Sequence, residues 1–115
     1  METKIKIFKA LGDKNRFKII KMLEKKELCL CEISCFLNLA NSTVSKHLSI
    51  LKNAGLIEDK KDGKWVNFKL VEANQNSFLE KILSLIREND EFEEIRIEKL
   101  NLLDRNIICS KENRC

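Results

Sequence analysis

The sequence contains no apolar run that approaches the roughly 20 residues needed to span a bilayer as a helix. Its first residues, METKIKIFKALGDKNR, lack the apolar segment and the small-residue cleavage site of an export signal. We therefore expect a cytoplasmic protein with no membrane partner. Proline, internal repeats and low-complexity linkers are also absent. The length of 115 residues predicts one domain, with or without a tail.

Charge is plentiful but unevenly distributed. Charged residues make up 35% of the chain and hydrophobic residues 43%, which indicates a globular, densely charged protein with a modest net charge of +4. Lysine dominates residues 41–69, whereas the segment from Asp90 to Asp104 leans acidic. A basic middle and an acidic end predict one face for an anionic partner and another for something else.

The first third of the chain has the periodicity of helices. The segment KIFKALGDKNRFKIIKMLEKK predicts two helices, the first ending at Gly12 and the second capped by the carboxylate of Asp13. The segment CEISCFLNL predicts a short third helix. The apolar stripe expected on that third helix consists of Ile33, Phe36, Leu37 and Ala40.

A fourth helix and a β-hairpin follow. In NSTVSKHLSILKNAG we expect a cap at Asn41 or Ser42 and a stop at Gly55, with Val44, Leu48 and Leu51 buried. The period then falls to two in LIEDKK and KWVNFKL, and the Asp62-Gly63 pair between them predicts a tight turn. NSFLEKILSLIREN predicts another helix. The predicted fold class is mainly α with a small β-hairpin.

A short helix, a turn, a polar-faced helix and a basic hairpin form the arrangement of a winged helix-turn-helix. The outer side of the fourth helix carries short hydroxyls and one cation, which suit phosphate oxygens and base edges, and the hairpin lysines can follow the phosphate backbone. The predicted DNA-binding residues are Ser42, Thr43, Ser45, Lys46, His47, Ser49, Lys60, Lys61 and Lys64.

Each of these features also has a purely structural explanation. The fourth helix could be an ordinary amphipathic helix whose polar side is solvated. His47, at the margin of the buried stripe, is either a packed, hydrogen-bonded side chain or a phosphate contact. Trp65 fits hairpin packing better than a base-stacking platform.

Three of the five cysteines lie within ELCLCEISC. Cys31 and Cys35 fall about 40° apart on the side of the third helix opposite its apolar stripe, and a spacing of four residues brings their Cβ atoms to about 5–6 Å. Cys29 can join them only from extended chain ahead of the helix, because two helical residues rotate by about 200°. The helix N-terminus and nearby Lys25 and Lys26 favour thiolates, which soft metals require.

Four blocks carry a family resemblance: ALGDKNRFKIIKML, ELCLCEI, STVSKHLSILKNAGLI and KDGKWVNFKL. In order and approximate spacing they resemble the ArsR/SmtB family of winged-helix repressors over residues 5–87. The resemblance implies a homodimer built from the first helix and the helix at residues 75–89. This dimer binds operator DNA and is released from it by an inducer, and we expect no enzymatic activity. We therefore expect a winged helix-turn-helix DNA-binding and dimerisation domain at 1–89. The resemblance does not reach the rest of the chain, where we expect a charged C-terminal helix or tail with two cysteines at 90–115.

The cysteines also resemble the ELCVC signature of arsenic- and cadmium/lead-responsive members. Cys29 and Cys31 match it, whereas Cys35 matches by function only, because arsenic-responsive members have C-x-C-x-x-C where this chain has C-x-C-x-x-x-C. The sole histidine lies in the fourth helix, so the His- and carboxylate-rich site that other members carry on the dimer helix cannot form. The metal-binding set Cys29, Cys31 and Cys35 therefore implies As(III) or Sb(III) as the inducer, with Cd(II) or Pb(II) as further candidates.

Other uses of the thiols remain open. Cys109 and Cys115 can be additional ligands, a redox pair or inert thiols. A thiol redox or persulfide sensor on the same scaffold is the alternative function, because exposed thiols of low pKa beside a partner thiol also suit oxidation. A thiol enzyme is disfavoured, since no C-x-x-C motif stands beside a βαβ pattern and the sole histidine lies in the polar-faced helix.

Overall fold

Four helices make up the N-terminal half of the chain: α1 (Glu2–Leu11), α2 (Lys14–Lys25), α3 (Leu30–Leu37) and α4 (Asn41–Asn53). The structure is a computed structural model, and it describes residues 2–72, 77–87, 95, 97–104 and 108. Oδ2 of Asp13 accepts hydrogen bonds from the backbone N–H groups of Asn15 and Arg16, each at 3.0 Å. The predicted cap of the second helix is therefore confirmed.

For the fourth helix, α4, the predicted buried face is confirmed and the predicted N-cap is wrong. Val44, Leu48 and Leu51 are buried as predicted. The N-cap is Ala40, and not Asn41 or Ser42, and it makes no side-chain hydrogen bond. The helix begins one residue earlier than its polar side chains suggest because the backbone carbonyl of Ala40 already accepts the N–H of Val44, at 3.1 Å.

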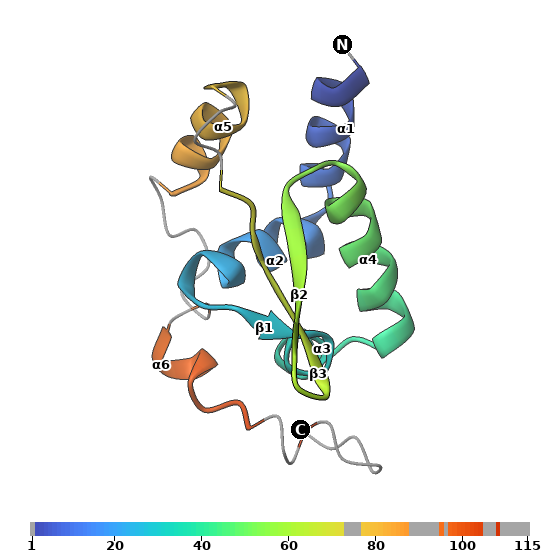
Figure 1. Cartoon of the computed structure of the whole chain (residues 1–115), viewed down its shortest axis with the longest axis vertical. Coiled ribbons are helices and arrows are strands. Elements are labelled where there is room, and N and C mark those ends of the chain that lie inside the picture. Colours follow the sequence, from blue (N-terminus) through green and yellow to red (C-terminus); the bar gives the residue numbers. More distant parts are fainter. Residues whose placement is uncertain (1, 73–76, 88–94, 96, 105–107, 109–115) are drawn as a thin grey trace.

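The predicted hairpin is formed by β2 (Ile57–Asp62) and β3 (Trp65–Leu70). Its turn lies at Gly63 and Lys64, one residue later than predicted, because Asp62 pairs with Trp65 inside the ladder. Of the two turn residues only Gly63 has a positive φ, of 61°, which is the pattern of a type II′ turn. A third strand, β1 (Leu28–Cys29), pairs antiparallel with β3 and gives the sheet order β1-β3-β2 (Figure 1).

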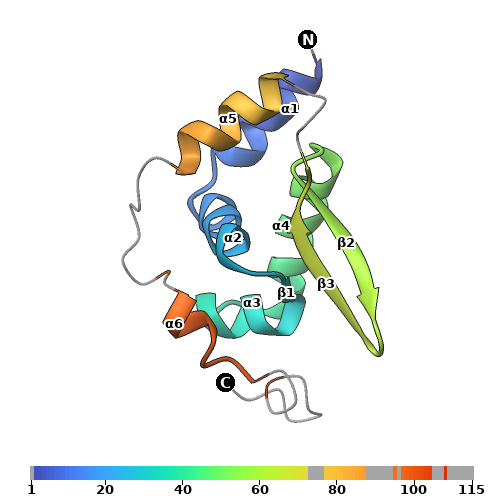
Figure 2. The same ribbon diagram turned by 60° about the vertical axis from the view of Figure 1, so that its left-hand side comes forward.

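The second half adds α5 (Ser77–Arg87) and the single turn α6 (Ile97–Leu100). α5 lies beside α1 in Figure 2, where the rings of Phe8 and Phe78 meet edge to face with centroids 5.9 Å apart. Ile95 and Leu100 belong to the same hydrophobic core as α2 and α3. The described part of the predicted tail therefore contributes to the core of the winged helix.

A buried lysine ties α5 to that core. The Lys21 side chain is only 2% exposed; its Nζ lies 2.8 Å from Oε1 of Glu24 and donates to the carbonyl of Ile86, also at 2.8 Å. Ile86 is in the last turn of α5, where a cation is favoured by the helix dipole. Among the described residues, no helix has the length and apolar character needed to span a membrane.

Candidate nucleic-acid interface and thiol site

One face of α4 is exposed at five of the positions predicted to bind DNA. We call it the reading face; its members are all exposed and consist of Ser42, Thr43, Ser45, Lys46 and Ser49. The hairpin of β2 and β3, called the wing from here on, lies next to α4 (Figure 1). The structure thus places the reading face and the wing side by side.

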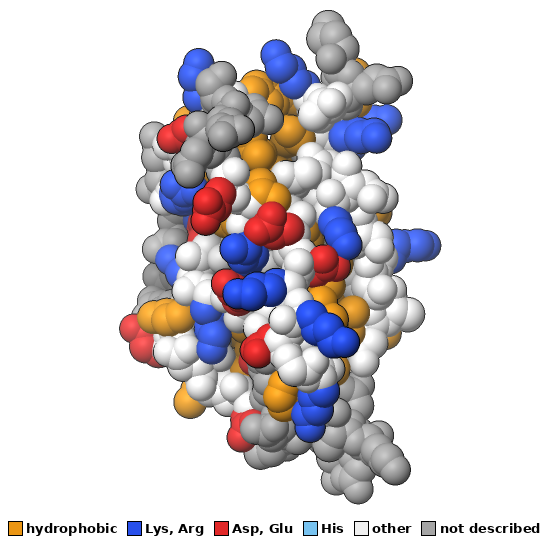
Figure 3. Space-filling view, viewed as in Figure 1, with side chains coloured by type: hydrophobic (Ala, Val, Ile, Leu, Met, Phe, Trp, Pro, Cys, Tyr) orange, Lys and Arg blue, Asp and Glu red, His pale blue; other side chains and the backbone are white. Residues whose placement is uncertain are grey.

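The wing carries exposed lysines of its own: Lys60, Lys61 and Lys64. Nζ of Lys64 lies 4.6 Å from the ring centroid of Trp65, so this tryptophan packs within the hairpin. Nζ of Lys52 on α4 lies 2.7 Å from Oδ2 of Asp59 on β2. Such an exposed pair contributes at most about 1 kcal/mol, but it joins the two predicted DNA-binding elements. Figure 3 shows lysine and arginine side chains interspersed with acidic ones over this side of the molecule.

His47 is held by the junction of α1 and α2. Its side chain is 13% exposed, its Nδ1 lies 3.3 Å from Nη1 of Arg16, and its Nε2 lies 3.9 Å from Oδ2 of Asp13. Nε of Arg16 also donates to the carbonyl of Ala10 at 2.7 Å. His47 is therefore packed and close to polar partners, which is one of the two alternatives that the sequence allowed. The other alternative, a phosphate contact, stays a prediction.

The same junction sets the charge state of Asp13. Partial burial raises the pKa of its carboxyl, but the amide hydrogen bond and positive charge of Arg16, with His47 and the Asn15 amide, outweigh this and bring the pKa below its usual 3.8. The carboxylate is therefore stabilised in the folded state. Its contribution to stability is present above the unfolded-state pKa and is lost as the pH falls through the folded-state pKa.

We expect Asp13→Ala to lower the free energy of unfolding by about 1 kcal/mol at pH 7, because the first turn of α2 loses its cap. The difference from the wild type should shrink as the pH falls below 3.8 and the wild-type carboxylate takes up a proton. Urea denaturation at several pH values measures this. Asp13→Asn, which keeps a capping oxygen without the charge, should lose less; equal stability of Asp13→Ala and wild type at pH 7 would disprove the assignment.

The thiol site lies where β1 ends and α3 begins. Cys29 is the N-cap of α3, with an extended backbone (φ −90°, ψ 168°), and the helix starts at Leu30. Cys29 therefore lies in extended chain ahead of the helix, which is the position that the sequence analysis required of it. Neither cysteine is in a disulfide; Cys29 is 3% exposed and Cys31 is half-buried.

A capping box surrounds Cys29. Its backbone N–H donates to Oε1 of Glu32 at 2.9 Å. In the other half of the capping box the backbone N–H of Glu32 faces the sulfur of Cys29, which is a weak acceptor. Glu32 itself is 3% exposed. Glu32 was not among the predicted site residues, although the spacing C-x-x-E is a capping-box pattern with cysteine in place of serine.

Cys35 is disulfide-bonded. A sulfur in a disulfide is not a thiolate, so Cys35 can serve as a metal ligand only after reduction. Among the described residues, no three Cys, His, Asp or Glu side chains lie close enough together to hold a metal ion. Cys109 and Cys115 lie outside the described residues. Cys29 and Cys31 lie two residues apart at the junction of β1 and α3, and a three-coordinate site there needs a further ligand that the described residues do not place beside them.

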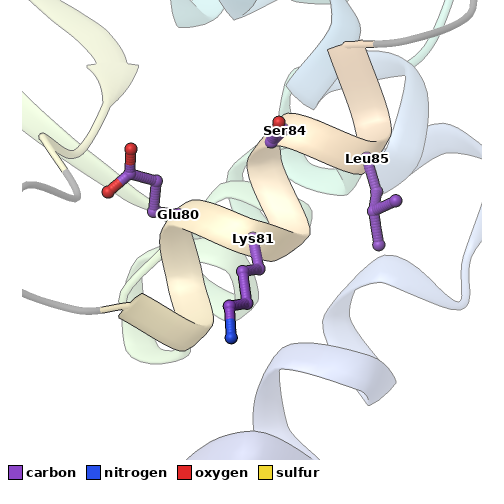
Figure 4. Close-up of a pocket in the computed structure, with 4 residues that line it drawn as sticks. All are labelled: Glu80, Lys81, Ser84 and Leu85. Atoms are coloured by element: carbon purple, nitrogen blue, oxygen red, sulfur yellow. The ribbon is translucent and has the colours of Figure 1, made fainter.

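α1 and α5 together expose apolar side chains: Ile5 (51%), Phe8 (56%) and Leu85 (62%). Nζ of Lys4 lies 4.9 Å from the ring centroid of Phe78 at the same place. A shallow pocket along α5 is lined by Glu80, Lys81, Ser84 and Leu85, and Figure 4 shows Lys81 and Leu85 projecting from the same side of the helix. Large apolar side chains left exposed on neighbouring helices indicate a surface for another protein.

Known proteins are similar to this chain in sequence. The family model described as "Bacterial regulatory protein, arsR family" matches residues 13–59. The arsenical resistance operon repressor of Escherichia coli (strain K12) is 40% identical over 67 residues, which cover 57% of this chain and 57% of that protein. An uncharacterized HTH-type transcriptional regulator of Methanocaldococcus jannaschii is 40% identical over 72 residues, which cover 62% of this chain and 81% of that protein.

A solved structure has a similar fold. Reduced HlyU from Vibrio cholerae N16961 superposes with a TM-score of 0.63 at 27% identity, over 75% of this chain and 86% of that chain. Little more than half of the Escherichia coli repressor is spanned by the matched residues.

Proposed function

Because this chain belongs to the ArsR family of bacterial regulatory proteins, we propose that it is a metal-responsive transcriptional repressor. It binds operator DNA as a homodimer and is released when a thiophilic ion binds the thiols at the start of α3. The observation that carries this proposal is the pair of thiols, Cys29 and Cys31, at the N-terminus of α3, the helix that directly precedes α4 and its reading face.

DNA binding is supported by the exposed hydroxyls and lysine of the reading face beside the lysine-bearing wing. No acidic residue lies within α4, so nothing on that helix repels phosphate. In winged-helix proteins of this arrangement the second helix of the helix-turn-helix enters the major groove. The wing lysines then lie where they can follow the phosphate backbone.

Dimerisation is supported by the apolar side chains that α1 and α5 expose. A second copy of the chain that presents the same surface would cover them in a two-fold interface. Two reading faces related in this way match the two half-sites of a palindromic operator. The proposed partners are therefore a second copy of this chain and double-stranded DNA.

The inducer follows from the donor atoms. Thiolates select soft ions, and a set made of Cys29, Cys31 and reduced Cys35 would suit the three-coordinate As(III) or Sb(III), with Cd(II) or Pb(II) as alternatives. Titrating reduced protein with each ion while following thiolate absorption and operator binding tests this assignment. Release by arsenite or antimonite supports the proposal, whereas release by none of the four ions would end it.

Replacing the wing lysines should weaken DNA binding in a salt-dependent way. Each phosphate contact contributes about 0.9 to the slope of log K against log[salt], so Lys60→Gln with Lys61→Gln should lower the slope by nearly 2 and weaken binding to any DNA sequence alike. Fluorescence anisotropy at several salt concentrations measures the slope. Lys99→Gln, which changes an exposed lysine of α6, is the matched control; an unchanged slope in the double variant would remove the wing from the interface.

A second candidate function is thiol redox sensing, and the disulfide at Cys35 favours it. Two thiols would give their protons and two electrons to a peroxide, which becomes two molecules of water as the disulfide forms. The test compares operator affinity after peroxide and after a phosphine reductant, in wild type and in Cys35→Ser. A change that peroxide causes and Cys35→Ser removes supports redox sensing; release by arsenite alone supports the metal sensor.

A further inference from the structure

Cys29 is part of the sheet that forms the wing. β1 pairs with β3 through two residue pairs, Leu28 with Phe68 and Cys29 with Asn67. On its other edge β3 pairs with β2 along its whole length, from Leu70 opposite Ile57 to Trp65 opposite Asp62. The strand that carries the thiol is therefore the third strand of the wing's own sheet.

The residue opposite Cys29 is itself tied to the end of the wing. Asn67 is 9% exposed, and its Nδ2 donates to Oδ2 of Asp62 at 3.2 Å. Asp62 is the last residue of β2 before the turn. A shift of β3 at Asn67 is therefore passed to the wing tip both through the backbone ladder and through this side-chain hydrogen bond.

Glu32 fixes Cys29 in this position. Its Oε1 accepts the backbone N–H of Cys29 at 2.9 Å, and both residues are 3% exposed. An ion that captures the buried sulfur must displace part of these surroundings. The β1–β3 pairing has two residue pairs, whereas α3 has eight helical residues, so the short ladder is the element that opens more easily.

We infer that ion binding at Cys29 acts on the wing through β1 and β3, and that Glu32 is the positioning residue that couples the thiol to this sheet. The route is separate from the packing of α3 against α4, which acts on the reading face. The inference rests on the proposed function, because it requires an ion that binds the thiols. It adds that release moves the wing and not the reading face alone.

The only tryptophan of the chain reports on this route. Trp65 lies on β3, two residues from Asn67, which is about 7 Å along a strand. In reduced, DNA-free protein, arsenite should change Trp65 fluorescence with the same midpoint as the arsenic–thiolate absorption. Hydrogen exchange of the backbone amides of residues 28–29 and 67–68 should become faster in the same titration, and this readout needs no variant.

Glu32 variants separate coupling from binding. Glu32→Ala keeps every thiol, so it should still bind arsenite, but its Trp65 response should fall and its operator release should weaken at least tenfold. Glu32→Gln retains an acceptor for the Cys29 N–H and should restore both. Glu98→Ala, which changes an exposed glutamate of α6, is the control and should behave as wild type.

The outcomes distinguish this inference from the function on which it rests. Arsenite binding with a response of Trp65 and of the 67–68 amides supports it. Arsenite binding and operator release with Trp65 and these amides unchanged overturns the inference and leaves the metal-sensor proposal standing. No arsenite binding by reduced protein overturns both.

Discussion

Replacing Cys31 by serine is expected to leave operator binding intact and to abolish release by arsenite. The side chain of Cys31 is half-buried and a free thiol, so a hydroxyl of similar size should be accepted by the fold. A serine hydroxyl, however, is a hard ligand that soft ions do not select. With the thiol lost, the free energy that couples the ion site to the reading face is lost as well.

The expected size of this effect is large. A coupling free energy of about 3 kcal/mol corresponds to a change in operator affinity of over a hundredfold, and the variant should show almost none of it. Fluorescence anisotropy of a labelled operator, with reduced protein and increasing arsenite, measures the difference. Cys35→Ser in parallel shows whether a third thiol is needed. A Cys31→Ser protein that still releases DNA at the wild-type arsenite concentration would contradict the assignment.

An aspartate in the apolar surface of α1 and α5 is expected to separate the proposed dimer. Phe8 and Leu85 are 56% and 62% exposed in the single chain, and a second copy would bury them. Burying an unpaired carboxylate in an apolar interface is costly, so Phe8→Asp or Leu85→Asp should give a monomer. A monomer contacts one half-site, and we expect its operator affinity to fall by about a hundredfold or more.

Sedimentation at micromolar protein measures this change. The matched control is Leu102→Asp, because Leu102 is 83% exposed and lies outside α1 and α5. The control should remain a dimer with unchanged operator affinity. If Leu85→Asp and Phe8→Asp both stay dimeric and bind DNA as wild type does, the dimer surface lies elsewhere.

Local signals were sufficient for much of the fold. Asp13 could be identified as a cap because its carboxylate bonds to amides two and three residues along the chain. The buried face of α4 followed from the spacing of Val44, Leu48 and Leu51, and the hairpin followed from alternation around Gly63. In each case the deciding contacts lie within a few residues in sequence.

What sequence reasoning missed depends on distant partners. β1 is two residues long, too short for alternation to show, and exists because Leu28 and Cys29 meet Phe68 and Asn67. The burial of Cys29 follows from that pairing. The environment of His47 depends on Arg16, which is 31 positions away. The disulfide at Cys35 could not be deduced from cysteine spacing, because spacing does not determine connectivity.

One titration tests the central claim most directly. Purified, reduced wild-type protein would be presented with double-stranded DNA carrying an operator obtained by selection from random sequences, and arsenite would then be added. We predict tight binding without arsenite and a loss of affinity of over a hundredfold once the thiols at Cys29 and Cys31 are occupied. Failure of the protein to bind double-stranded DNA, both in the presence and in the absence of soft ions, would contradict the account.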